Sequence, residues 1–110
     1  MSLNKDVILA GINEAAQRMG LDFEDLIEMI DDVLEDCTSK IGSLRDAAGK
    51  GDATQVAAIA HDIKGSTINY GLVAPSEVAK DIEHRKLDAV DRVDELESIL
   101  LEIQGMGISG

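Results

Sequence analysis

His61 has the residue type and the setting best suited to chemistry in this chain. Apolar residues around it recur at helical spacing, which predicts a helix whose buried face excludes the histidine. That buried face consists of Val56, Ile59, Ala60, Ile63 and Thr67. The predicted neighbours of His61 on the exposed face are Ala57, Ala58, Lys64 and Gly65. An exposed imidazole among small side chains is an accessible nucleophile, and an ordinary histidine is mostly neutral at pH 7, so it needs no separate base.

Gly65 is an unusual residue for the middle of a helix. A glycine there costs roughly 0.5–1 kcal/mol relative to alanine. Room for another molecule to approach His61 would compensate for that cost, and we interpret Gly65 in this way.

The segment from Ala60 to Thr67 reads AHDIKGST, and Gly71 follows ten residues after the histidine. This pattern resembles the signature of histidine-containing phosphotransfer (Hpt) domains, and the flanking helical pattern extends the resemblance from about Leu21 to Gln104. The resemblance implies a helical bundle that carries a phosphoryl group on one exposed histidine, here His61, between the aspartates of receiver domains.

The resemblance also implies roles for residues near His61. Lys64, one turn along the same face, is expected to meet the charge of the phosphoryl oxygens. Gly65 and Ser66 are expected to complete the phosphoryl-binding site. In some members an acid or amide bonds the second imidazole nitrogen, and Glu83, twenty-two residues after the histidine, has that spacing. Glu83 is therefore the candidate imidazole-orienting residue, with an ordinary solvated glutamate as the equal alternative.

Partner docking is expected on the face around His61, where Ala57 and Ala58 give low relief and Ile68 adds an apolar contact. The sequence shows no GxxxxGK phosphate loop and no cluster with metal-ligand spacing. We therefore expect a phosphoryl carrier rather than an enzyme, with no metal site or cofactor of its own. The resemblance implies that a receiver domain supplies the Mg²⁺ and the acidic pocket.

The charge of the chain narrows the classes of partner. It has 22 acids against 10 Lys and Arg residues, a net charge of −12, which disfavours nucleic acid and anionic membranes. No apolar run approaches the roughly eighteen residues of a membrane span, and the N-terminus lacks signal-peptide features. Cys37 is the single cysteine, so there is no disulfide framework. We expect a cytoplasmic monomer.

The hydrophobic pattern predicts an all-α fold, an antiparallel up-down four-helix bundle with an additional short N-terminal helix. The expected helices span about 4–19, 23–48, 53–70, 75–86 and 89–104 of a single domain, 1–104. Asn4, Asp22 and Asp52 are the predicted helix N-caps. The last two helices should be separated by a break near residues 86–88, and the tail 105–110 is expected to fray.

Three functions are compatible with these observations. The first is a carrier between receiver-domain aspartates in a two-component phosphorelay, with a sensor histidine kinase as a further candidate partner. The second is an Hpt-like domain phosphorylated by a chemotaxis-type kinase core. The third is a non-catalytic acidic helical interaction module, which would need the bundle but not His61. A histidine-based hydrolase is disfavoured, because no nucleophile, base and orienting group form a set.

Overall fold

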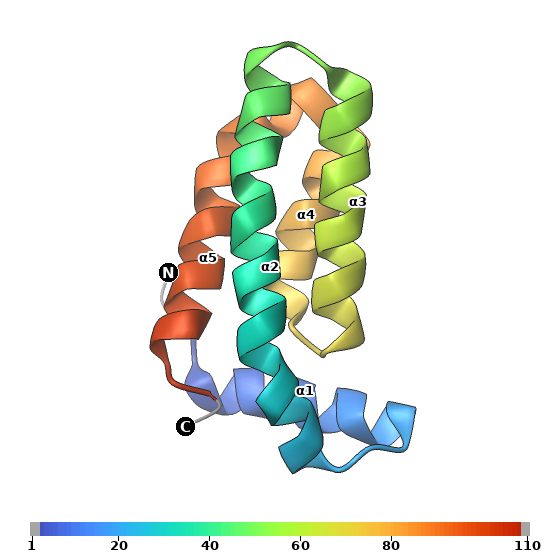
Figure 1. Cartoon of the computed structure of the whole chain (residues 1–110), viewed down its shortest axis with the longest axis vertical. Coiled ribbons are helices and arrows are strands. Elements are labelled where there is room, and N and C mark those ends of the chain that lie inside the picture. The colour runs from blue at the N-terminus through green and yellow to red at the C-terminus, as the bar shows by residue number, and fades with distance from the viewer. Residues whose placement is uncertain (1–2, 109–110) are drawn as a thin grey trace.

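The computed structural model describes residues 3–108 and is helical, with no strand in that range. The elements are α1 (Lys5–Met19), α2 (Phe23–Gly49), α3 (Ala53–Asn69), α4 (Val73–Arg85), the 3₁₀ helix η1 (Lys86–Arg92) and α5 (Val93–Gly105). Helices α2 to α5 run alternately up and down, and α1 lies across one end of them (Figure 1). The predicted all-α antiparallel bundle with a short additional N-terminal helix is confirmed.

The apolar stripes of the helices form the core. On α2 the buried residues are Leu26, Ile30, Leu34, Cys37, Ile41, Leu44 and Ala47. On α3 they are Val56, Ala60, Ile63 and Thr67. Burying a large aliphatic side chain stabilises the fold by about 1.5–3 kcal/mol relative to exposure, so these stripes fix the rotation of each helix. Burial also raises the pKa of the Cys37 thiol to about 11, and Cys37 packs as a small hydrophobe.

Two of the three predicted helix caps form side-chain hydrogen bonds. Asn4 Oδ1 accepts from two backbone amides of the first turn of α1, at 2.8 and 3.4 Å. Asp52 Oδ1 accepts from the backbone N–H of Gln55 at 3.1 Å. Asp22 occupies the N-cap position of α2 but makes no side-chain cap hydrogen bond. The start of α2 therefore depends on the packing of its apolar stripe rather than on a cap.

The corner between α4 and α5 differs most from the predicted helix bounds. The expected break is present, but the chain continues through it as η1, so α5 begins at residue 93 rather than near residue 89. Arg85 donates to the backbone carbonyl of Asp88 at 3.0 Å and to Asp81 at 2.9 Å. Arg92 donates to the same carboxylate at 3.0 Å. Two arginines that converge on Asp81 therefore hold the corner.

Two smaller differences concern the ends of α4 and α5. Helix α4 begins at Val73, two residues before Pro75, because a first-turn nitrogen needs no intrahelical acceptor and proline is tolerated there. The chain does not fray from residue 105, since α5 includes Gly105 and Ile108 is only 8% exposed against the core. Burial of that isoleucine outweighs the flexibility of the glycines beside it. Residues 109–110 of the expected tail lie outside the described residues.

Lys86, at the junction of α4 and η1, has φ 55° and ψ −121°, a conformation that favours glycine. We expect Lys86→Gly to raise the free energy of unfolding by about 1 kcal/mol, because the strain of a side chain there exceeds the entropic cost of glycine. Lys86→Ala removes the same charge and keeps the Cβ, so it should bring no gain. Chemical denaturation of both variants checks this, and equal stabilities would contradict it.

Candidate functional site

His61 lies near the middle of α3 on the exposed side of the helix. Its side chain is 62% exposed, because the buried stripe of α3 turns this position away from the core. The exposure that the helical periodicity predicts is therefore present. An imidazole in this position can meet a reacting group on another molecule without any rearrangement of the bundle.

Glu83 of α4 joins His61 and Lys64 through one carboxylate. Its Oε2 lies 2.7 Å from His61 Nδ1, and its Oε1 lies 2.6 Å from Lys64 Nζ. The carboxylate is only 20% exposed, so these contacts replace much of its contact with water. The alternative of a solvated glutamate in a charged run does not describe this side chain.

The charge on Glu83 determines which imidazole nitrogen is available. The hydrogen bond from Lys64, and secondarily the one from His61, hold the pKa of Glu83 below its ordinary value, although partial burial opposes them. Glu83 is therefore ionised at neutral pH and can only accept hydrogen bonds. In the neutral imidazole the proton then lies on Nδ1, and the lone pair lies on Nε2.

The remaining predicted site residues divide into two groups by their angle around α3. Ala57, Ala58, Gly65 and Ile68 all lie within about 60° of His61 around the helix, at 100° per residue. Ile68 is 38% exposed, and a Cβ built on Gly65 would meet nothing within 4 Å. These residues leave open space above the histidine, as expected.

Ser66 is not brought to this site. It lies about 140° around α3 from His61, and about 200° from Lys64, at 100° per residue. The charge of the neighbouring Asp62 contributes to raising the pKa of Lys40 on α2, which agrees with this flank of α3 lying on the side of α2. Among the three expected phosphoryl-binding residues, the structure groups only Lys64 and Gly65 with the imidazole.

A family model for the Hpt domain matches residues 28–106. This chain belongs to the Hpt domain family. Hpt domains are phosphocarrier modules that transfer phosphoryl groups through a histidine in phosphorelays, together with receiver domains and kinases. No curated protein and no solved structure matches the chain. Helix α1 and the first turn of α2 precede the matched region, so they are features of this Hpt domain that the family match does not cover.

At this site of the Hpt domain, sequence reasoning missed one contact, the ion pair between Lys64 and Glu83. A signal for it was present, because His61 and Lys64 are three residues apart on one face. An acid on the facing helix that reaches one of them is within range of the other. The lysine is thus held by a carboxylate rather than left solvated.

Within residues 3–108 no group of three or more His, Cys, Asp or Glu residues is placed to hold a metal ion. In the same range no helix combines the length and the apolar character needed to cross a membrane.

Gly65→Ala should raise the stability of the domain and lower its rate of phosphoryl transfer. Because the space above Gly65 is open, alanine should raise the free energy of unfolding by roughly 0.5–1 kcal/mol through helix propensity. The same methyl group narrows the approach to His61 and should slow phosphoryl transfer from a protein donor. Thermal unfolding and transfer rates from a loaded receiver check the two effects, and a stabilised variant with unchanged rates would show that Gly65 is not part of the docking face.

Proposed function

We propose that this Hpt domain carries a phosphoryl group on Nε2 of His61 between receiver-domain aspartates in a two-component phosphorelay. The proposal rests on the 2.7 Å contact between His61 Nδ1 and Glu83 Oε2, which directs the free lone pair of the imidazole away from the bundle. It includes the roles expected of Lys64 and Gly65 in binding the phosphoryl group, and of Ala57, Ala58 and Ile68 in docking. In this proposal the domain is a cytoplasmic monomer, a phosphoryl carrier without a nucleotide or metal site of its own.

The transfer step exchanges one bond for another. Nε2 of His61 attacks the phosphorus of an aspartyl phosphate, the N–P bond forms, and the P–O bond to the aspartate breaks and releases its carboxylate. Nδ1 keeps its proton throughout, so the phosphorylated ring is cationic. Glu83 lies against that proton and stabilises the positive charge. The reverse step delivers the group to a second aspartate.

Lys64 has two possible partners in this cycle. Without a phosphoryl group its ammonium is paired with Glu83 Oε1 at 2.6 Å. A phosphoryl group on the ring brings negative oxygens to the same face, and a flexible ammonium can turn to them. Transfer of this kind depends mainly on positioning and on neutralising charge, and the receiver domain is expected to bring the Mg²⁺ that does much of the latter.

The test supplies the Hpt domain with two kinds of donor. One is a receiver domain loaded with acetyl phosphate and Mg²⁺, and the other is a chemotaxis-type kinase core with ATP. We expect an acid-labile, base-stable phosphoryl group on the chain from the receiver, detected by intact-mass spectrometry. Labelling by the kinase core alone would favour an Hpt domain that a chemotaxis-type kinase phosphorylates. Absence of labelling by every active donor would overturn the proposal and favour a non-catalytic interaction module.

Glu83→Ala should lower the initial rate of phosphoryl uptake by about 10- to 100-fold, the range that holds for groups that orient metal-ligating histidines. Glu83→Gln should lose less, because the amide oxygen still accepts from Nδ1–H. The ¹⁵N shifts of the ring provide a second readout, because Glu83→Ala should produce a mixture of tautomers. Glu35→Ala, an exposed acid on α2, is the matched control. A slow Glu83→Ala variant with the wild-type tautomer would assign Glu83 a different role.

A further inference from the structure

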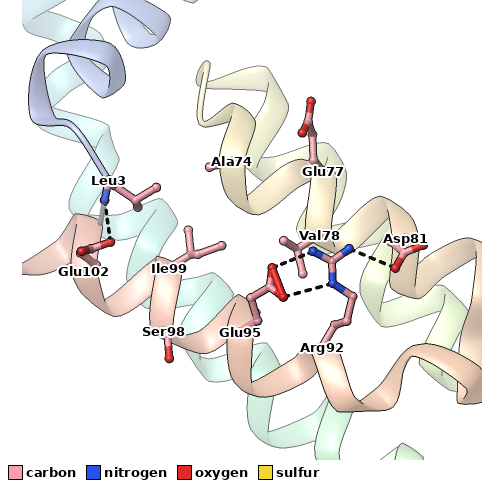
Figure 2. Close-up of a pocket in the computed structure, with 10 residues that line it drawn as sticks. All are labelled: Leu3, Ala74, Glu77, Val78, Asp81, Arg92, Glu95, Ser98, Ile99 and Glu102. Atoms are coloured by element: carbon pink, nitrogen blue, oxygen red, sulfur yellow. Dashed lines mark hydrogen bonds and ion pairs between the residues drawn. The ribbon is translucent and has the colours of Figure 1, made fainter. Parts of the chain in front are cut away.

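A groove of about 890 Å³ lies between α4 and α5, apart from His61. Leu3, residues of α4 and residues of η1 and α5 line it, and no residue of α3 does. Val78 of α4 and Ile99 of α5 point into the space between the two helices, with Leu3 and Ala74 at one end (Figure 2). The floor of the groove is therefore apolar.

The rim of the groove is acidic. Four carboxylates line it, from Glu77, Asp81, Glu95 and Glu102, against the single guanidinium of Arg92. Arg92 is already engaged, because it donates to Asp81 at 3.0 Å and to Glu95 at 2.6 Å (Figure 2). It therefore links the two walls and leaves the groove with an excess of negative charge.

The two remaining carboxylates of the rim are less occupied. Glu102 accepts one neutral hydrogen bond, from the backbone N–H of Leu3 at 3.2 Å. Glu77 is exposed, and no hydrogen bond or ion pair of its side chain is found among the described residues. An apolar floor between such acids attracts a ligand that is apolar on one side and positively charged at its edges.

We propose that this groove binds a cationic amphipathic helix of another protein. Residues of the groove recur at three- and four-residue spacing, from 92 to 102 along one wall and from 74 to 81 along the other. The longer wall spans about 15 Å of helix, which matches two to three turns of a ligand helix. Such a ligand places apolar residues at i, i+3 and i+4 on the floor, and Lys or Arg residues beside Glu77 and Glu102.

This binding leaves His61 accessible. Asp81 and Glu83 are two residues apart on α4, which is about 200° around a helix. Asp81 lines the groove, whereas Glu83 contacts the imidazole. A protein held in the groove can therefore stay bound while a second partner reaches the histidine, and the inference does not depend on the proposed phosphoryl transfer.

The probe is a synthetic Leu/Lys peptide of about 14 residues with leucines at helical i, i+3 and i+4 spacing. A second peptide of the same composition, with its leucines scattered, controls for adsorption to an acidic protein. Titration at physiological salt is followed by fluorescence anisotropy and by ¹⁵N–¹H NMR of the whole chain. We expect the amphipathic peptide to bind at least about tenfold more tightly, with shifts centred on Ala74, Val78 and Ile99.

Matched variants locate the binding site. Ile99→Arg should remove the preference for the amphipathic peptide, whereas Leu101→Arg, on the exposed side of the same helix, should keep it. Ile99 is half-buried, so an arginine there can also disturb the packing of α5. Glu77→Lys on the exposed rim therefore gives an independent test, with Glu35→Lys on α2 as its control. Glu77→Lys should weaken binding more than Glu35→Lys does.

Three results would overturn the inference. The first is equal affinity for the two peptides, which would indicate adsorption to the acidic surface only. The second is a set of shifts centred on α2 around the exposed Glu35, away from the groove. The third is self-association of the free chain that Ile99→Arg abolishes, measured by sedimentation velocity, which would assign the groove to a second copy of this chain.

Discussion

His61→Gln is expected to abolish phosphoryl uptake from every donor that labels the wild-type chain. Glutamine keeps a polar side chain of similar reach, but its amide nitrogen has no lone pair available for attack on phosphorus. Because the imidazole is 62% exposed and outside the core, the free energy of unfolding should change by no more than about 0.5 kcal/mol. Loss of labelling in a stable chain then reports chemistry rather than folding.

The second histidine of the chain supplies the matched control. His84 is exposed, follows Glu83 directly on α4, and has no hydrogen bond or ion pair in the described part of the chain. His84→Gln should leave the rate of uptake within about twofold of wild type, since a surface change away from the site alters little. Intact-mass spectrometry before and after acid treatment distinguishes the variants. Acid-labile labelling that survives His61→Gln would move the acceptor to another residue.

Most of the fold could be predicted from the sequence because helical periodicity is a local property. The stripe of α2 from Leu26 to Leu44 and the caps at Asn4 and Asp52 each follow from residues within a few turns of one another. The α4–α5 corner was less accessible. Its form depends on Arg85 and Arg92 reaching Asp81, four and eleven residues away, and spacing alone does not show which acid an arginine will choose.

Part of the site could be predicted from the sequence for the same reason. The exposure of His61 follows from the apolar stripe of its own helix, whereas its contact with Glu83 depends on where α3 ends and α4 begins. His61 is eight residues before the end of α3 at Asn69, and Glu83 is ten residues after the start of α4 at Val73. At 1.5 Å per residue, the two lie at comparable depths below the shared turn. The sequence shows that His61 and Glu83 are twenty-two residues apart, but the position of the turn between α3 and α4 determines whether the two side chains meet.

For Ser66, the motif and the helical angle indicate different positions relative to the phosphoryl site. Its place in the motif beside Gly65 associates it with the phosphoryl site. Five residues of helix nevertheless turn it about 140° away from His61. A motif records which residues occur together, and the helical angle determines which of them face the same ligand.

Gly71→Ala is expected to be the most destabilising of these substitutions, lowering the free energy of unfolding by about 2–5 kcal/mol. Gly71 has φ 77°, and an L-residue in that conformation costs about 1–2 kcal/mol. A Cβ there would also collide with the backbone carbonyl of Gly11 and the amide nitrogen of Ile12. Overpacking of this kind costs a further 1–3 kcal/mol or so, because two backbones cannot move apart as a flexible side chain would.

Two other glycines separate these contributions. Gly20 has φ 70° with nothing within 4 Å of an added Cβ, so Gly20→Ala should show the backbone cost alone, about 1–2 kcal/mol. Gly11 is helical, and its added Cβ would meet the carbonyl oxygen of Gly71, so Gly11→Ala should show the collision without left-handed strain, offset by a helix-propensity gain of roughly 0.5–1 kcal/mol. Chemical denaturation of the three variants gives the comparison. If Gly71→Ala costs no more than Gly20→Ala, α1 does not pack closely on the α3–α4 turn, and the helix outside the Hpt match would be only loosely attached to the bundle.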